Sequence, residues 1–179
     1  MKTPRRHKIS VYLAGKVSKG IDDHTMRGWR DEYRKLLNTD GTINFLTPEN
    51  EKLDENNPMH VVGHDLYLLK CSDILIVNAS EKLGVGTAQE MVIAKYFGKP
   101  VLTVLPPDSH HRRSNFVMNG ILIRDWIHPF VSVTSDMIFS SVEALRDFLE
   151  NENLDDVISA AKDMTIIDNA ISVYECTIK

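Results

Sequence analysis

An almost uninterrupted apolar run at residues 73–78 (DILIVN) limits the fold of this chain more than any other feature. A continuous apolar run rich in β-branched residues is typical of a strand covered by helices on both faces. Similar runs occur at residues 8–14 (KISVYLA) and 100–105 (PVLTVL), and a shorter one at 43–46. These four segments predict neighbouring strands of one buried, parallel sheet.

Helical patterns separate the strands. Apolar residues recur every three to four positions from Asp22 or Asp23 to Leu37, Pro58 opens a second helix that extends to about Lys70, and residues 87–97 form a third helix, which Gly98 ends. Strands that alternate with helices of this length predict a doubly wound α/β fold, with helices on both faces of a mostly parallel, five-stranded sheet.

The pattern is weaker after residue 105. Residues 106–120 are rich in Pro, His and Arg and indicate a loop with room for one helical turn, and 131–133 are a candidate fifth strand. Residues 140–149 and 154–161 indicate surface helices, and 170–177 have the composition of a strand. We find no repeat and no linker, and 179 residues suit one core, so we expect a single domain over residues 1–179.

Charge and cysteine content narrow the class of partner. A net charge of -4 gives no general field for a nucleic acid polymer or an anionic membrane, and a small molecule fits better. Cys71 and Cys176 lack the spacing of metal ligands, so we expect a cytoplasmic protein with both cysteines in the core. His110 and His111 are adjacent but lack the acidic or cysteine partners of a zinc site, so no metal is expected.

Residues 83–90 (LGVGTAQE) carry the clearest chemical signal. Gly84 and Gly86 let the backbone approach a ligand closely, at an edge of the sheet where ligands bind in doubly wound folds. We expect Glu90 to lie in the first turn of the following helix, where N–H groups and the macrodipole favour its ionised form. Two interpretations remain open here: a nucleophilic carboxylate, or an ordinary capping residue that pairs with Thr87 or the backbone.

Four segments, taken in order and spacing, resemble the nucleoside 2-deoxyribosyltransferase family over about residues 8–120: VYLAG (11–15), HDLYLLKCSDILIVNAS (64–80), GTAQE (86–90) and GKPV (98–101). The resemblance implies a flavodoxin-like fold and double displacement at the anomeric carbon, through a covalent ribosyl-enzyme intermediate and without a cofactor. It implies Glu90 as the nucleophile, Tyr12 as the residue that holds its carboxylate, and Asp65 as the group that contacts the sugar or protonates the leaving base. From the residues alone, Tyr12 is equally a buried core aromatic and Asp65 an exposed helix residue.

We expect substrate to bind at the loops that follow the strands, at Gly15, Lys16, Gly84, Gly86 and Thr87. Asn115 matches a family asparagine that reaches into the neighbouring subunit and binds the sugar 5′-hydroxyl. We therefore expect a homo-oligomer, a dimer or larger, with sites completed across the interface. Otherwise Asn115 is a loop residue that caps a short helix. Asp73 also matches a family position, and we expect it to be structural, as the polar entry to a buried strand.

One departure concerns the residue six positions before Glu90. The family carries an acidic residue there, which helps to read the base, and this chain has Gly84. The motif LGVG at residues 83–86 instead resembles a related branch of the family that hydrolyses nucleoside 5′-monophosphates. A 5′-phosphate needs donors, which Lys16, Ser18, Lys19 and Gly20 could supply, with Arg112 and Arg113 across an interface. These side chains are equally consistent with solvated loop charges. Residues 126–130 (WIHPF) suit a base-stacking lid or, preferably, a hydrophobic oligomer contact.

The leading hypothesis is an enzyme that cleaves or transfers the N-glycosidic bond of a (deoxy)nucleoside or nucleoside 5′-monophosphate. Two alternatives stay open: a nucleoside 5′-monophosphate N-glycosidase, and a nucleotide-binding sensor that has kept the fold without turnover. A flavin-binding or response-regulator-like domain is disfavoured, because no acidic cluster suited to phosphoryl transfer follows the first strand.

Overall fold

The computed structural model describes residues 8–17, 24–38, 41–50 and 52–178, with the side chains of residues 24–27 left out. The helix cap expected at Asp22 or Asp23 and the phosphate donors expected at Ser18, Lys19 and Gly20 lie outside the described residues.

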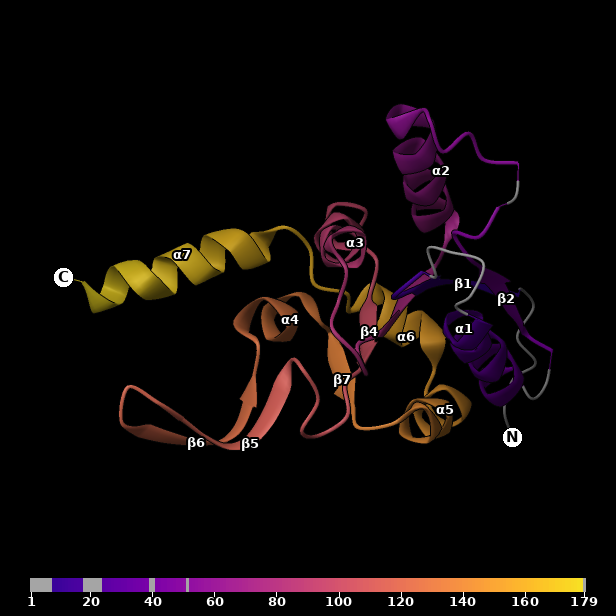
Figure 1. Ribbon diagram of the computed structural model, residues 1–179. Helices are drawn as coiled ribbons and strands as arrows, with labels where there is room; N and C mark the ends of the chain where they lie inside the picture. The colour runs from indigo at the N-terminus through magenta and orange to yellow at the C-terminus, as the bar shows by residue number, and fades with distance from the viewer. Residues whose placement is uncertain (1–7, 18–23, 39–40, 51, 179) are drawn as a thin grey trace.

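Five parallel strands form the centre of the molecule (Figure 1). They are β1 (Ile9–Ala14), β2 (Ile43–Leu46), β3 (Ile74–Asn78), β4 (Val101–Val104) and β7 (Met137–Phe139). Their order in the sheet is β2-β1-β3-β4-β7, and every neighbouring pair is parallel. This order is the flavodoxin-like one, so the predicted fold class is confirmed. Residues after β1 and β3 meet where the strand order reverses, which is where ligands bind in such sheets.

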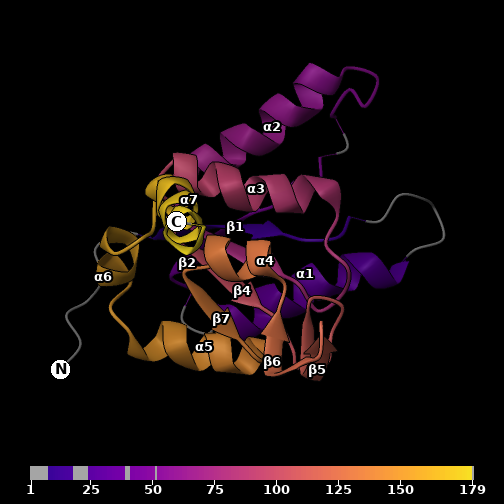
Figure 2. The same ribbon diagram turned by 90° about the vertical axis from the view of Figure 1, so that its left-hand side faces the viewer.

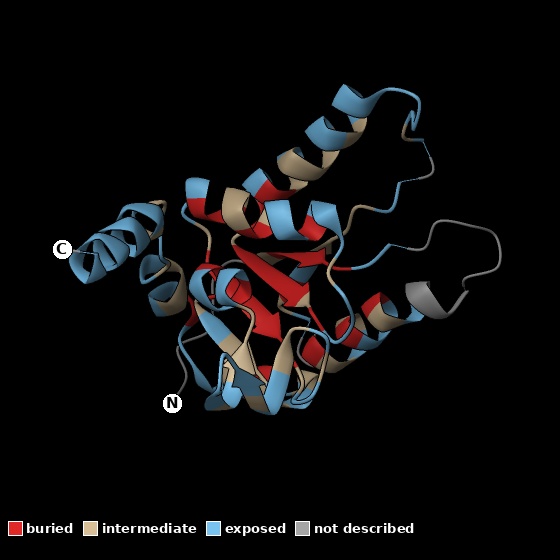
Figure 3. Cartoon of the chain, turned by 60° about the vertical axis from the view of Figure 1, so that its left-hand side comes forward, coloured by how far each residue is buried: buried red, intermediate tan, exposed pale blue. Residues whose placement is uncertain are grey.

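Helices cover both faces of the sheet, as predicted. On one face pack α1 (His24–Leu37), α5 (Val142–Asn151) and α6 (Leu154–Ser159), and on the other α2 (Pro58–Cys71), α3 (Val85–Tyr96) and α4 (Pro129–Thr134). Strand β1 contributes side chains to the hydrophobic cores on both faces of the sheet, because alternate side chains of a strand point to opposite faces. Val11 and Leu13 join the first core, and Tyr12 and Ala14 join the second. Figure 3 shows the buried residues concentrated in this sheet.

The segment predicted as a loop over residues 106–120 is in part a β-hairpin. Strands β5 (Arg112–Met118) and β6 (Ile121–Ile127) pair antiparallel and are joined by Asn119 and Gly120. Both turn residues have positive φ, 50° and 77°, as a tight hairpin turn requires. The Asn-Gly dipeptide between apolar residues is a strong hairpin signal. Sequence analysis missed this signal because the preceding residues, rich in Pro, His and Arg, have the composition of a loop.

Two predicted strands are wrong. Residues 131–133 lie in α4, which Pro129 opens at its first position, and the fifth strand is β7 instead. Residues 170–177 belong to α7 (Thr165–Thr177), an exposed helix with no buried residue. Short apolar runs do not distinguish strand from helix, and tertiary context decides.

The cysteines are also misplaced by the prediction. Cys71 ends α2, Cys176 lies on α7, and both are exposed and free rather than in the core. Both cysteines lie on exposed faces of their helices, so the apolar character of cysteine does not determine its burial here. None of the helices that the described ranges contain is long and apolar enough to cross a membrane.

Candidate active site

Tyr12 and Glu90 are joined by a hydrogen bond between β1 and α3. The Tyr12 hydroxyl donates to Glu90 Oε1 at 2.7 Å, the contact that the family resemblance implies. Tyr12 is fully buried and Glu90 is partly exposed. Burial and the neighbouring carboxylates Glu90 and Asp65 raise the pKa of Tyr12, so the phenol stays protonated and acts as a donor. The tyrosine therefore fixes one carboxylate oxygen and leaves the other for a ligand.

Glu90 lies one turn deeper in α3 than predicted. The helix starts at Val85 with Gly84 as its N-cap, which makes Glu90 the sixth helical residue rather than a first-turn residue. The unpaired N–H groups of the helix end are therefore not its neighbours. Burial raises the pKa of Glu90, with Asp65 adding to the rise, while the Tyr12 hydroxyl and the charge of Arg30 oppose it. The predicted first-turn position of Glu90 is therefore wrong, and burial rather than the helix end gives the direction in which its pKa moves.

Asp65 lies on α2, near this pair. Its charge raises the pKa of both Tyr12 and Glu90, so the three groups are close enough to interact. His64 Nδ1 lies 2.9 Å from Asp65 Oδ1, and both side chains are partly buried, at 17% and 27% exposed. Sequence analysis overlooked His64. This histidine can share a proton with Asp65, so the two form a candidate proton donor beside Glu90.

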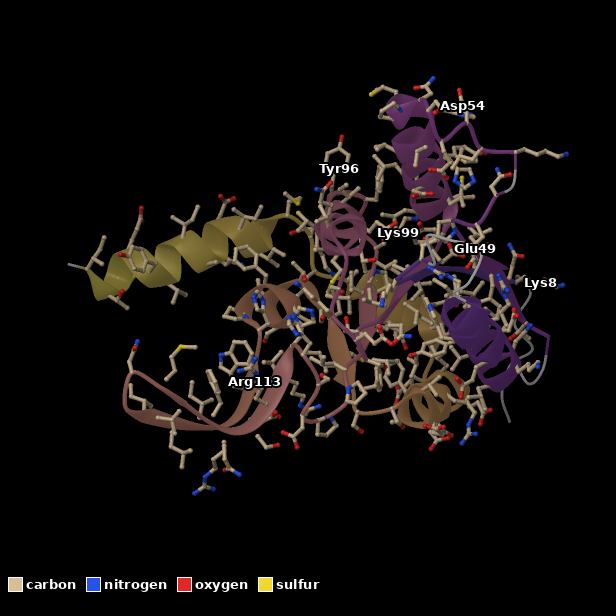
Figure 4. The ribbon with its side chains drawn as sticks, in the orientation of Figure 1. Lys8, Glu49, Asp54, Tyr96, Lys99 and Arg113 are labelled. Carbon is tan, nitrogen blue, oxygen red and sulfur yellow. The ribbon has the colours of Figure 1, made fainter. Side chains whose placement is uncertain are left out.

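Arg30 is a second residue that sequence analysis missed. Its side chain is 1% exposed, and its Nη atoms donate to Gly15 O and Lys16 O at 3.2 Å each and pair with Glu49 at 3.1 Å. Figure 4 labels Glu49 in the segment after β2. Arg30 thus fixes the end of β1 and lends positive charge to Glu90. Its signal was available, because Arg30 shares the apolar face of Tyr33 and Leu37 at i, i+3 and i+7.

The loop residues predicted to bind substrate fall into two groups. Gly15 is required by the protein itself, because an added Cβ would lie 2.8 Å from the Trp29 ring. Gly84 and Gly86 have open space where a Cβ would stand, which is consistent with room for a ligand. Thr87 is buried at 5% exposed. The binding role of each of these residues stays a prediction.

A cavity of about 530 Å³ opens at the carboxyl edge of the sheet, on the side of α1 and α5. Its walls include Lys16, Trp29, Tyr33, Asn78 and Ser141. Tyr12, Asp65 and Glu90 do not line it, because they lie on the side of α2 and α3. Lys16 contributes to this cavity and also forms an exposed ion pair with Glu81 at 3.1 Å. The loops after β1 and β3 therefore border both the cavity and the Glu90 side of the sheet.

Asn115 lies on the hairpin, where it is exposed and has a φ of 51°. It caps no helix, so that alternative is wrong. The left-handed backbone at Asn115 breaks the alternation of the strand and brings Phe116 within 5.2 Å of Trp126. The side chain of Arg113, labelled in Figure 4, lies near both rings. Arg112 forms a bidentate ion pair with Asp125 and is not available as a free cation.

His111 supports the turn that leads into α3. Its Nε2 accepts the backbone N–H of Leu83 at 2.9 Å, and burial and the nearby His110 and His128 lower its pKa. The aromatic segment 126–130 packs in part around these histidines, while Phe130 remains 76% exposed. Within the part of the chain that the structure describes, no three His, Cys, Asp or Glu side chains are grouped to hold a metal. Asp73 is structural, since its Oδ2 accepts Ser10 N at 2.8 Å.

Comparisons with known proteins define the class of fold. No protein-family model matches the sequence, and no curated protein matches it. The solved 2-deoxyribosyltransferase from Bacillus psychrosaccharolyticus superposes with a TM-score of 0.56 at 17% identity, over 86% of this chain and 98% of that one. The 2-desoxiribosyltransferase from Leishmania mexicana gives 0.58 at 17% identity, over 81% and 99%. The CMP N-glycosidase BcmB from Clostridium botulinum gives 0.47 at 16% identity, over 80% and 99%.

The chain is therefore a flavodoxin-like α/β protein. More particularly, it has the fold of the 2-deoxyribosyltransferases, the family that the sequence resembles, and it spans almost their whole length.

Proposed function

We propose that this chain cleaves or transfers the N-glycosidic bond of a (deoxy)nucleoside or nucleoside 5′-monophosphate. One observation carries the proposal. Glu90 is a partly exposed carboxylate that accepts a hydrogen bond from the buried Tyr12 hydroxyl, and the charge of Asp65 lies close enough to raise its pKa. This arrangement occurs in a chain with the fold of two 2-deoxyribosyltransferases. The same two-carboxylate logic underlies retaining glycosidases.

In the proposed first step, the free Glu90 oxygen attacks C1′ of the sugar. The C1′–N bond breaks, its electron pair passes to the base nitrogen, and Asp65 supplies the proton that the leaving base requires. In the second step, the nitrogen of another base or a water oxygen attacks C1′, and the C1′–Glu90 bond breaks. The attacking base or water gives up a proton, which returns to Asp65. Transfer and hydrolysis differ only in this acceptor. His64, at 2.9 Å from Asp65, is positioned to exchange that proton.

Tyr12 and Arg30 act on the charge of Glu90. Both lower its pKa against the effect of burial, so each favours the ionised nucleophile. An oxocarbenium-like transition state carries positive charge at C1′, so a carboxylate that water solvates poorly stabilises that charge strongly. The burial that raises the pKa of Glu90 also strengthens this attraction.

The test is release of free base. The protein is incubated with a panel of nucleosides, 2′-deoxynucleosides and their 5′-monophosphates, with and without a second base, and the products are separated by chromatography. We expect free base with at least one substrate, and a new nucleoside if the acceptor is a base. Tight binding across the panel without any release would replace this proposal with the nucleotide-binding sensor.

The 5′-phosphate is a separate question. Two of the candidate cations are already paired, Lys16 with Glu81 and Arg112 with Asp125, which favours a substrate without a 5′-phosphate. The Lys16 pair is exposed and therefore weak, so a phosphate can still displace Glu81. The nucleoside 5′-monophosphate N-glycosidase is supported if kcat/KM is higher for the monophosphate and falls about tenfold or more in Lys16→Met.

We further propose that Asn115 serves the site of a neighbouring copy in a homo-oligomer. Its exposure on a projecting hairpin supports this, because Figure 1 shows the hairpin extending away from α2 and α3. Mixing inactive Glu90→Gln with inactive Asn115→Ala tests it. Recovery of activity on mixing supports a shared site, whereas a mixture as inactive as its components rejects it.

A further inference from the structure

One side chain ties the loop before α3 to the base of the β5–β6 hairpin. His111, the residue before β5, accepts the Leu83 N–H at Nε2 over 2.9 Å. Within the described residues, this is the one hydrogen bond that joins the backbone of residues 81–84 to another element. Figures 1 and 2 show α4 between α3 and the hairpin, and the ring of His128, the N-cap of α4, lies edge-on to His111 at 5.6 Å.

The segment that carries His111 is fixed by bonds that do not involve this loop. Arg112 Nη1 donates to Leu105 O, at the end of the central sheet, over 3.1 Å. The His111 carbonyl oxygen accepts His128 N at 2.9 Å. These bonds place the imidazole independently of the loop, so His111 can position Leu83 rather than follow it.

The bond to Leu83 requires the neutral form of the histidine. A ring nitrogen that accepts a hydrogen bond carries no proton, so the proton of neutral His111 lies on Nδ1. Among the described residues, this buried Nδ1 has no hydrogen-bond partner. In the imidazolium both ring nitrogens are donors, so Nε2 would direct an N–H group at the Leu83 N–H. Protonation of His111 therefore breaks the bond.

The groups that face His111 disfavour its charged form. Burial lowers the pKa of His111, and so do the neighbouring His110, His128 at the start of α4 and Lys82 in the loop before α3. No carboxylate of the described chain forms an ion pair with it. The bonded state thus has a pKa below the ordinary 6.5, whereas a released imidazole regains that value. Because the released state binds more protons below pH 6.5, acid favours release of the loop.

The loop that His111 holds leads directly to the proposed nucleophile. Gly84, the residue after Leu83, is the N-cap of α3, and Glu90 is the sixth residue of that helix. Glu90 is held separately, through the hydroxyl of Tyr12 at 2.7 Å. Release of Leu83 therefore moves the start of the helix and the glycines beside it, while the carboxylate keeps its own partner. Substrate binding should change more than the chemical step.

We propose that His111 is a positioning residue, which holds residues 83–87 in place for substrate while its imidazole is neutral and releases them when the imidazole is protonated. This regulation rests on the proposed function, because the loop is assigned to substrate binding there. Release of the loop is measured without substrate, so the two proposals can fail separately.

The first test is hydrogen exchange at the Leu83 amide of the full chain, followed by NMR from about pH 8 to about pH 5, the range in which histidine titrates. The protection factor, corrected for the intrinsic pH dependence of exchange, should fall about tenfold or more as the pH falls. The amide of Ala79, which donates to Val104 O at 2.9 Å, is the internal control and should keep its protection. Constant protection at Leu83 overturns the proposal.

Two substitutions of His111 separate the bond from its titration. A glutamine oxygen can stand close to the position of Nε2 and accepts at every pH, so His111→Gln should keep Leu83 protected without the pH dependence. His111→Ala should lose the protection at every pH. His60→Gln, which alters an exposed histidine on α2, is the matched control and should behave as the unmodified protein. Unprotected Leu83 in that control, or protected Leu83 in His111→Ala, overturns the proposed role.

Kinetics then test the consequence for the site, on a substrate that releases free base. As the pH falls, KM of the unmodified protein should rise about tenfold relative to KM of His111→Gln, and kcat should change less. The ratio removes the titration of Glu90, which both proteins share. A KM that follows the same pH profile in both proteins overturns the positioning role. If no substrate is turned over, the proposed function fails, while the exchange experiment still decides whether His111 controls the loop.

Discussion

Helix α3 carries one buried and one partly buried charged group, in very different surroundings. Lys95, fully buried near its C-terminal end, pairs with Asp136. The two oxygens of Asp136 also accept Val101 N at 2.6 Å and Lys162 N at 2.7 Å. Five residues earlier, Glu90 accepts the Tyr12 hydroxyl and faces the like charge of Asp65.

The difference separates a structural site from a candidate catalytic one. The buried Lys95–Asp136 pair, in which both carboxylate oxygens accept hydrogen bonds, joins α3 to the start of β4, to the residue before β7 and to the segment after α6. Glu90, by contrast, accepts one hydrogen bond from the described residues and lies near a like charge, so its ionised form is disfavoured in the free protein. Side chains with pKa values perturbed in this way are frequent at active sites. The comparison predicts that substitutions at the two positions have opposite effects on stability and activity.

The largest expected effect is on turnover in Glu90→Gln. Base release should fall by about four orders of magnitude or more, because a neutral amide cannot attack C1′. The free energy of unfolding should hold or rise, since the amide removes a buried charge without changing shape. Product chromatography and urea unfolding on the same preparation test both parts. Normal turnover would remove Glu90 from the mechanism, and a large loss of stability would show that it is structural.

Asp136→Ala should have the reverse profile. Removing the carboxylate leaves Lys95 buried and unpaired, which costs about 3–5 kcal/mol of stability. Urea or thermal unfolding measures the loss, and the exposed Asp168→Asn is a matched control that should change stability by less than about 0.5 kcal/mol. A loss in Asp136→Ala no larger than in the control would contradict the structural interpretation of this pair.

Tyr12→Phe should have an intermediate effect. Loss of the hydroxyl removes a donor that lowers the pKa of Glu90, so kcat should fall about ten- to a hundredfold. The acidic limb of the pH–rate profile should move to higher pH. A purely structural tyrosine would lower kcat without moving that limb, and such a profile would reject the positioning role.

The smallest expected effect is on the pH dependence of stability. The pKa of Glu90 is raised above its ordinary value of 4.5, so the folded chain binds more protons than the unfolded chain between 4.5 and the raised value. Stability contributed by Glu90 is therefore present at low pH and is lost as pH rises through that window. The difference in unfolding free energy between the unmodified protein and Glu90→Gln should widen with rising pH. A difference that stays constant would show that the pKa is not raised.

The sequence predicted the parts of the molecule that local pattern controls. The strands near residues 8–14, 73–78 and 100–105 were clear because buried parallel strands are apolar throughout. The Tyr12–Glu90 contact followed from the family resemblance, because these residues are 78 positions apart and no local pattern joins them. Arg30 was missed because a charged side chain on a helix is normally assigned to solvent.

Regions after residue 105 were harder, for a physical reason. The strand-like composition of residues 170–177 suits a helix as well, and no packed neighbour of α7 exists within the described chain to indicate which state holds. The start of α3 was placed two residues late because Val85 and Gly86 are poor helix formers, and this error put Glu90 in the first turn of the helix instead of its second.

The most direct test of the central claim is the covalent bond to Glu90. The protein is incubated with a 2′-deoxy-2′-fluoro nucleoside, whose fluorine slows breakdown of a glycosyl-enzyme, then quenched in acid and digested for mass spectrometry. The proposed mechanism predicts one added fluorodeoxyribosyl group on the peptide that contains Glu90, and none in Glu90→Gln. Release of base with the added mass on a different residue would contradict it.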